Sequence, residues 1–449
     1  MSNIYDCQRS YSWVRRYIIF TFKRFYGEYI VTGRENIPQE GPVIFASNHL
    51  NALMDALAVI SVTPQKLPII YLGRADMFKN VRARKILHFC KLLPAFRQHE
   101  GYINLEKNLE IFDLCSDVLD HNKAIGIMPE VRQGFSRKIR QLGKGTFRIA
   151  FSAQQKYMTQ PGVKIVPIGI DFEDFENYGK YIILNIGKPI EVSEYMTEYM
   201  ENPVKATNRI RERLRQDLIK LTFNLDTVKN YEYFETATAV ANMAVTKKMN
   251  LQNKTLPRFL ARQKIAEWLI KMEKKSQPMT DQLEIYCKEY KENLHELNLQ
   301  SWVFDEKTYK TKHLFVTILV LIITLPVYII GFLLNMLPFF SPDIILKALK
   351  VDLRGGISSL RFGLGMFTFP IFYFIQGVFI YKMLNGYFWN LIIIIPLQYF
   401  FGKLTFQWYK TYKKLVGKLR HRKLEYTKSE TFERTQILHE QIIGMVKAS

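Results

Sequence analysis

Cysteine is scarce in this chain of 449 residues, and acidic side chains are outnumbered by basic ones. The four cysteines, Cys7, Cys90, Cys115 and Cys287, lie far apart and form no CxxC pair. This spacing excludes a disulfide framework and a cysteine-based zinc site, and it fits a reducing compartment. Asp and Glu total 41 against 63 Lys and Arg, so the net charge is +22. Such a chain favours a polyanionic partner, which could be nucleic acid, anionic lipid or a phosphorylated substrate.

Charged residues are missing altogether from three long stretches near the C-terminus. Residues 314–342 form an uncharged run of 29 residues, and runs of 20 residues follow at 362–381 and 383–402. Because a bilayer core requires about 20 apolar residues of helix, the runs predict membrane spans. A very hydrophobic soluble helix fits poorly with three such runs in one region. We therefore expect an integral membrane protein whose basic charge meets anionic lipid and not nucleic acid.

No cleavable signal peptide is expected at the N-terminus, since the first apolar stretch, residues 17–22, is short and lies between basic residues. Residues 11–30 interleave Trp, Tyr, Phe and Ile with Arg and Lys. This pattern predicts an interfacial membrane-associated helix within residues 1–30. An ordinary amphipathic helix that covers a core would have the same pattern.

The next 200 residues alternate short apolar runs with helical patterns. Buried strands are expected at 42–46, 67–72, 124–128, 163–170 and 181–186, with helices at 75–92 and 105–119 among them. Residues 31–228 should therefore form an α/β domain in which a mixed sheet is flanked by helices. The remaining regions are a helical spacer or lid (229–312), a transmembrane region (313–403) and a basic cytoplasmic tail (404–449).

A histidine and an aspartate follow the first of these strands. If Asn51 caps the next helix, His49 lies in the loop and Asp55 lies about one turn inside the helix. The carboxylate could then accept the Nδ1 proton of His49, which leaves Nε2 free to take a proton from a bound hydroxyl. The spacing alone is a weak signal, because a loop histidine beside a surface aspartate is common.

Three further blocks follow His49 in a particular order. They are Leu93-Pro94-Ala95-Phe96-Arg97, Met128-Pro129-Glu130-Val131-Arg132 and Ile165-Val166-Pro167-Ile168. Together with the His49 block they resemble the four motifs of the glycerolipid acyltransferase superfamily, which contains lysophosphatidic acid and glycerol-3-phosphate acyltransferases. The resemblance covers roughly residues 10–225.

The resemblance implies a role for each matching residue. His49 and Asp55 would be the catalytic dyad, Arg97 and Glu130 would hold the acceptor, and Pro167 would shape the acyl pocket. Two departures stand out: five residues separate His49 from Asp55 where most members have four, and Val131 replaces the usual glycine of the third motif. A β-branched residue does not permit the backbone freedom of glycine, so the acceptor could sit differently here.

The residues themselves also favour a phosphate site. Basic side chains flank the strand that ends near residue 128: Arg97, Arg132, Arg137, Lys138, Arg140 and Lys144. The planar fork of arginine suits phosphate, and Arg97 and Arg132 are the candidates for substrate binding. A solvated or lipid-facing basic rim is the simpler interpretation of most of the others. An acid in this basic stretch, Glu130 could orient an arginine, accept from a substrate hydroxyl or form a plain salt bridge.

The predicted function is a membrane-bound O-acyltransferase of phospholipid synthesis. It would move a fatty acyl group from acyl-CoA or acyl carrier protein to the hydroxyl of a lysophospholipid, with 1-acyl-glycerol-3-phosphate as the expected acceptor. The acyl thioester is a co-substrate, and neither a cofactor nor a metal is expected. The alternatives are glycerol-3-phosphate or another lysolipid as acceptor, a catalytically silent lipid-binding membrane protein, and a lipid hydrolase, which would lack its G-x-S-x-G elbow here.

The three uncharged runs raise a question of topology. A cytosolic donor places residues 1–312 in the cytosol, at the cytoplasmic membrane if the protein is bacterial, and three crossings would then put the tail outside. The tail and residues 341–361 are both net positive, which favours the cytosolic side for each. Residues 314–342 are therefore predicted to form a re-entrant hairpin bent near Pro326, followed by a true hairpin over 362–402. A single tilted span for 314–342 is the rival.

Overall fold

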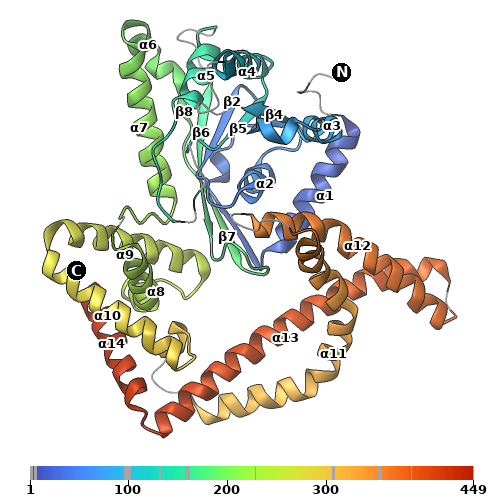
Figure 1. Cartoon of the computed structure of the whole chain (residues 1–449), viewed down its shortest axis with the longest axis vertical. Helices are drawn as coiled ribbons and strands as arrows, with labels where there is room; N and C mark the ends of the chain where they lie inside the picture. The colour runs from blue at the N-terminus through green and yellow to red at the C-terminus, as the bar shows by residue number, and fades with distance from the viewer. Residues whose placement is uncertain are drawn as a thin grey trace. The chain divides into compact units, whose positions relative to one another are not determined.

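The protein divides into two compact units, which we describe separately. The computed structural model describes residues 4, 8–95, 103–130, 134, 136–156, 162–227, 229–305, 309–350, 356–385 and 387–447. One unit comprises residues 1–224 together with 353–359, and the other comprises 225–352 together with 360–449. Figure 1 labels most of the helices and strands of both.

A mixed sheet organises the first unit, as the sequence predicts. The strand order in its described part is β1-β7-β6-β2-β5-β3-β4, with β8 paired to β6. The strands are β1 (Glu28–Thr32), β2 (Val43–Ser47), β3 (Ile69–Arg74), β4 (Leu92–Ala95), β5 (Ala124–Ile127), β6 (Lys164–Phe172), β7 (Tyr181–Ile186) and β8 (Ile190–Glu191). The pairs β6–β2, β2–β5, β5–β3, β3–β4 and β1–β7 are parallel, whereas β7 and β8 run antiparallel to β6.

The five predicted strands are all present, because each contains a continuous apolar run that is largely buried. Every residue of β2 and of β5 is buried. The predicted helix over 75–92 is wrong in part. The chain there forms a short 3-10 helix, η2 (Ala75–Phe78), then α3 (Val81–Phe89), and then enters β4.

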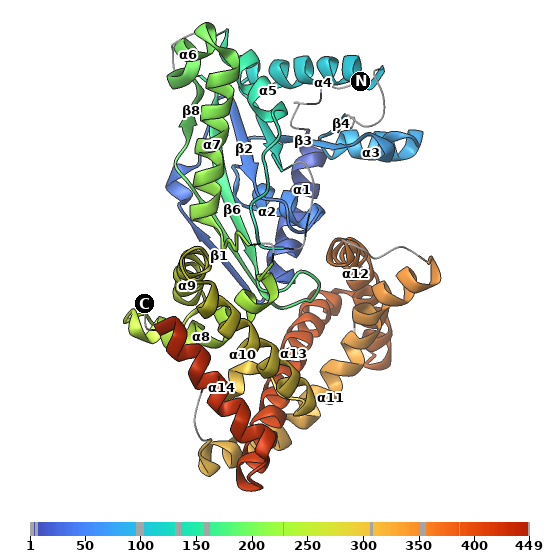
Figure 2. The same ribbon diagram turned by 60° about the vertical axis from the view of Figure 1, so that its left-hand side comes forward.

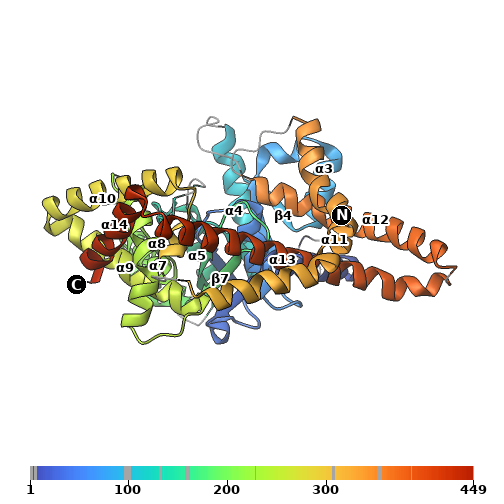
Figure 3. The same cartoon turned by 90° about the horizontal axis from the view of Figure 1, so that it is seen from below.

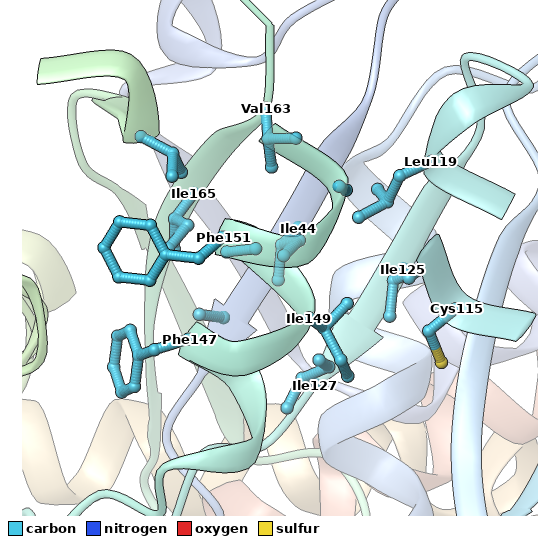
Figure 4. Packing of buried hydrophobic residues seen from close by; sticks show 14 of the residues in the cluster. Ile44, Cys115, Leu119, Ile125, Ile127, Phe147, Ile149, Phe151, Val163 and Ile165 are labelled. Carbon is cyan, nitrogen blue, oxygen red and sulfur yellow. The ribbon is translucent and has the colours of Figure 1, made fainter. Parts of the chain in front are cut away.

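Helices pack an apolar core against one face of the sheet. They are α4 (Ile103–Asp120), α5 (Gly145–Gln154) and α7 (Pro203–Leu221). The short helices η4 (Val192–Tyr195) and α6 (Met196–Glu201), which directly precede α7 in the chain, also contribute to this core. Figure 4 shows Phe147 and Phe151 of α5 over Ile44 of β2 and Ile165 of β6. Burial of each such side chain stabilises the fold by about 1.5–3 kcal/mol, so this layer keeps β2 in place.

Helices α1 (Arg9–Phe25) and α2 (Leu53–Val62) form a further layer: α2 packs on β2 and β6, and α1 packs on α2. The guanidinium of Arg15, 3% exposed, donates to the carbonyl oxygens of Leu67 at 2.9 Å and Thr63 at 3.2 Å. Trp13 and Phe20 are exposed on the same helix. The side of α1 that carries Arg15 thus packs on the domain. Contact of its exposed side with a membrane stays a prediction.

The second unit begins with a helical bundle that includes the end of the chain. Its helices are α8 (Tyr231–Lys248), α9 (Thr255–Lys275), α10 (Gln277–Glu296), the short η5 (Ser301–Phe304) and α14 (Glu430–Lys447). Arg434 of α14 donates to both carboxylate oxygens of Glu289 in α10, at 2.6 and 2.7 Å. The Tyr290 hydroxyl lies 3.0 Å from Nδ1 of His439. The predicted spacer and the last helix of the predicted tail therefore pack together.

Three helices in the described residues are long and apolar enough to cross a membrane. They are α11 (Thr311–Ala348), α12 (Ile357–Met383) and α13 (Leu391–Tyr426), which follows the short η6 (Phe388–Asn390). Helices α11 and α13 lie alongside each other (Figures 2 and 3). Large apolar side chains such as Ile323 and Ile392 are exposed on them, 67% and 77% respectively, as expected of helices that face lipid. In length and apolar composition these three helices are typical of a membrane protein.

The predicted reversal of the chain at Pro326 is wrong. Helix α11 is continuous through Pro326, and Figure 1 shows it as one helix with a bend. On one side of the proline, Trp408 of α13 donates to the carbonyl of Leu321 at 3.1 Å. On the other side, Asn335 donates to the carbonyl of Gln398 at 3.2 Å. Both halves of α11 therefore follow the same neighbour, and proline bends such a helix without ending it.

The chain enters and leaves this apolar region at one place. Just before α11, the ring of Tyr309 lies 5.3 Å from the ring of His421, near the end of α13. Arg420 donates to the carbonyl of Asn298 at 2.7 Å. Both ends of the region 311–426 thus adjoin the bundle of α8, α9, α10 and α14.

The Arg15 contacts predict a stability effect. In Arg15→Lys the charge is kept, but the three donors of lysine sit on one atom and cannot reach all the acceptors that the two guanidinium nitrogens reach, so some of these buried acceptors lose their partner. We expect the free energy of unfolding of the first unit to fall by roughly 1–3 kcal/mol. A lower midpoint of thermal unfolding in the full-length protein measures this. Arg16→Lys, on the exposed side of α1, should leave the midpoint unchanged, and an equal effect of the two variants would contradict the prediction.

Candidate active site

The site lies at the carboxyl edge of the sheet. Strand β2 ends at Ser47 between its parallel neighbours β5 and β6. The carboxyl ends of parallel strands meet at one edge, which is where open α/β sheets bind ligands. His49 follows β2 and Glu130 follows β5, and the amide of His49 donates to Oε1 of Glu130 at 2.9 Å. The topology thus brings together two motifs 81 residues apart.

His49 and Asp55 form the pair that the sequence predicts. Nδ1 of His49 lies 2.9 Å from Oδ2 of Asp55, whose side chain is fully buried, while the His49 side chain is 23% exposed. A carboxylate offers only lone pairs, so the ring donates its Nδ1 proton and Nε2 keeps a lone pair. This is the tautomer that a general base requires.

The Asp55 carboxylate also shapes the loop. Its Oδ2 accepts from the amides of Leu50 at 2.9 Å and Asn51 at 2.7 Å, as well as facing His49. Burial raises the pKa of Asp55, and these hydrogen bonds act in the opposite direction. Asp55 is the third residue of α2, where a carboxylate can reach back to amides before the helix.

The predicted N-cap at Asn51 is wrong. The residue before α2 is Ala52, with φ 46° and ψ −120°, and its side chain makes no capping bond. Few non-glycine residues adopt such a positive φ, and surrounding contacts must hold one that does. The chain turns sharply at Ala52, and Oδ2 of Asp55 accepts from the two amides just before this turn, those of Leu50 and Asn51.

Two asparagines secure the loop to its surroundings. Asn48, 1% exposed, exchanges two hydrogen bonds with the backbone of Ile170 in β6: Nδ2 donates at 2.9 Å and Oδ1 accepts at 2.7 Å. The amide nitrogen of the Asn51 side chain donates to the carbonyl of Phe175 at 3.1 Å. Asn48 was absent from the predicted site, although a buried asparagine directly after an apolar strand signals such a backbone clamp.

Both carboxylate oxygens of Glu130 accept hydrogen bonds from other groups of the protein. It is 4% exposed; Oε1 accepts from the His49 amide, and Oε2 accepts from the Arg140 amide at 3.1 Å. The Arg140 guanidinium lies 3.4 Å from the same oxygen. Burial raises the pKa of Glu130, and these partners counteract the rise. Glu130 therefore stabilises the position of the His49 loop through the His49 amide. This role differs from the acceptor contact that the resemblance implies.

The remaining predicted residues divide into three groups. Arg137 is buried and donates to the carbonyl of Phe172 at 2.8 Å, so it stabilises the C-terminal end of β6. Pro167 lies buried in β6, in register with Ala46 of β2. Arg97, Val131 and Arg132 lie outside the described residues.

The arrangement can take a proton from a hydroxyl group near Nε2 of His49. The amides of His49, Leu50 and Asn51 donate to Glu130 and Asp55. Amides committed in this way cannot also stabilise an oxyanion, so donors to a developing charge must come from other groups.

Comparisons with known proteins identify the domain. The search of curated proteins gives no match. Among solved structures, this one is similar to the crystal structure of the 1-acyl-sn-glycerophosphate (LPA) acyltransferase PlsC from Thermotoga maritima. The two sequences are 16% identical, with a TM-score of 0.34 over 47% of this chain and 83% of that chain. The model of the Acyltransferase family matches residues 28–171, which include His49, Asp55 and Glu130. These residues therefore form a domain of the Acyltransferase family, and the protein is an acyltransferase enzyme.

Proposed function

We propose that this enzyme transfers a fatty acyl group from an acyl thioester to the hydroxyl of a lysophospholipid at the membrane surface. The observation that carries the proposal is the His49–Asp55 pair inside the matched domain, with Nδ1 facing the buried carboxylate. The donor would be acyl-CoA or acyl carrier protein, and the acceptor 1-acyl-glycerol-3-phosphate.

The proposed reaction needs no covalent enzyme intermediate. Nε2 of His49 takes the proton of the acceptor hydroxyl as its oxygen attacks the thioester carbonyl carbon. The carbon–sulfur bond breaks, and the leaving thiolate takes the proton back from the imidazolium. Asp55 stabilises the imidazolium while the charge exists, as a buried carboxylate at Nδ1 does in other His/Asp pairs.

The apolar helices support a lipid acceptor. An acceptor that already carries one acyl chain reaches the enzyme by lateral diffusion in the bilayer, whereas soluble glycerol phosphate gains nothing from α11, α12 and α13. We assign Arg97 and Arg132 to the acceptor phosphate, because arginine can donate two parallel hydrogen bonds to it. Glu130 acts in this proposal through His49 and not through the acceptor.

The proposal also orients the protein. The catalytic domain faces the cytosol, where the thioester donors are. Asn298 and Tyr309 contact Arg420 and His421, and α14 packs on α8 and α10. The apolar region 311–426 therefore enters and leaves the bilayer on the same side. This requires an even number of crossings, although three helices are long enough to cross.

The dyad predicts a loss of turnover. His49→Ala should lower kcat by about 10² to 10⁴, because the proposed general base at Nε2 is lost. Asp55→Asn should also be severely impaired, because an amide cannot hold the same tautomer. Thioester consumption with lysophosphatidic acid as acceptor measures both. His121→Ala is the matched control, since His121 and Asp117 form an exposed pair at 3.5 Å. Normal turnover of a folded His49→Ala enzyme would refute the proposed mechanism.

Glu130 and Arg97 should affect different kinetic constants. In Glu130→Gln the new amide donor must face one of two backbone amides, so the His49 loop shifts and kcat falls roughly tenfold while the acceptor KM changes little. Arg97→Ala should raise the acceptor KM and leave the thioester KM nearly unchanged. Steady-state kinetics with each substrate varied separates these effects. A Glu130→Gln variant that changes only the acceptor KM would favour the acceptor-binding role instead.

The same-side arrangement predicts a labelling pattern. Gln252 is exposed between α8 and α9, and Thr427 is exposed after α13. In a background without the four native cysteines, Gln252→Cys and Thr427→Cys should both resist an impermeant maleimide in intact cells and react after permeabilisation. External labelling of Thr427→Cys alone would contradict an even number of crossings. External labelling of both would contradict the cytosolic orientation.

A further inference from the structure

A distant segment of the chain returns to the catalytic unit between α11 and α12. The described residues 356–359 belong to the first unit and include the first turn of α12, whereas α11 and the rest of α12 belong to the second. Ser358 lies in the first turn of α12, and its hydroxyl donates to Oδ1 of Asn51 at 2.8 Å. Ser358 is 1% exposed and Asn51 is 3% exposed. This hydrogen bond joins residues 307 positions apart.

Asn51 is a sensitive point in the catalytic loop. It lies two residues after His49, and its backbone amide donates to Oδ2 of Asp55, the oxygen that faces the histidine ring. Its side chain has a partner at each end: Phe175 accepts from Nδ2, and Ser358 donates to Oδ1. The next residue, Ala52, has a positive φ. A strained backbone conformation persists only where surrounding contacts hold it. The two hydrogen bonds of the Asn51 side chain therefore help to hold the loop in this conformation.

We propose that Ser358 is a positioning residue for the His49–Asp55 pair. Its hydroxyl fixes the Asn51 amide, Asn51 holds the loop before α2, and the loop sets the place of Nε2. The first turn of a membrane-region helix is thereby part of the support of the catalytic site. The proposal rests on the proposed function of His49 as the general base.

Loss of the Ser358 hydroxyl would leave a buried amide oxygen without its donor. Such an oxygen has to rotate or recruit another donor, and either change moves the loop. Small displacements of a catalytic group cost far more in rate than in substrate affinity. The effect should therefore fall on kcat and leave KM for either substrate close to that of the unmodified enzyme.

The chain provides a matched control in the neighbouring residue. Ser359 lies in the same turn, and its Oγ is buried without a hydrogen-bond partner among the described residues. Ser359→Ala removes the same atom as Ser358→Ala from the same helix, but it removes no bond to the catalytic loop. A general effect of serine loss on α12 would appear in both variants.

The experiment uses the full-length enzyme in phosphatidylcholine vesicles with lysophosphatidic acid and a labelled acyl-CoA. We expect Ser358→Ala to lower kcat about tenfold, Ser358→Thr to restore most of it, and Ser359→Ala to change it less than about twofold. The double variant Asn51→Ala/Ser358→Ala should be no slower than Asn51→Ala alone, because Asn51→Ala already breaks the hydrogen bond that Ser358→Ala removes. A normal kcat in Ser358→Ala, an equal loss in Ser359→Ala, or additive losses in the double variant would overturn the proposal.

A second measurement does not depend on activity. Hydrogen exchange of the backbone amides at residues 49–51 should be faster in Ser358→Ala than in the unmodified enzyme, and unchanged in Ser359→Ala. Unchanged exchange in Ser358→Ala would overturn the positioning role even in an active enzyme. Faster exchange in an enzyme without acyl transfer would support the link from Ser358 to the loop and locate the failure in the proposed function.

Discussion

The catalytic loop depends on the fully buried carboxylate of Asp55. A buried charge is costly unless donors surround it, and here three donors meet on a single oxygen: the ring of His49 and the amides of Leu50 and Asn51. The same contacts that stabilise the charge therefore fix the backbone before α2 and the orientation of the histidine ring. The structure of the loop and the chemistry of the base have one physical origin.

The sheet supplies the rest of the support. Because β2 lies between β5 and β6, the loop after it can be held from both sides: Glu130 accepts the His49 amide, and Asn48 pairs with Ile170. The α4, α5 and α7 layer keeps these strands in register through apolar burial. A base held this firmly needs little rearrangement when charge develops, which is the advantage of a preorganised site.

Short-range patterns in the sequence predict much of this. The buried strands are apolar runs, and the dyad is visible because His49 and Asp55 flank the start of a helix. The turn at Ala52 was not predictable, since nothing in a local pattern demands a positive φ from alanine. The Ser358–Asn51 bond and the continuous course of α11 along α13 depend on contacts between distant residues. Pro326 marks a bend in a helix by its chemistry, but only the neighbouring helix decides whether the chain also turns back.

The most direct measurement of the central claim is the fate of the acyl group. Purified full-length enzyme in vesicles receives acyl-CoA labelled in its acyl chain, with or without 1-acyl-glycerol-3-phosphate. The account predicts that the label appears in diacylated phosphatidic acid at a rate that depends on the acceptor, with little free fatty acid. Release of labelled fatty acid at the same rate with and without acceptor would contradict it, because His49 would then activate water instead of a lipid hydroxyl.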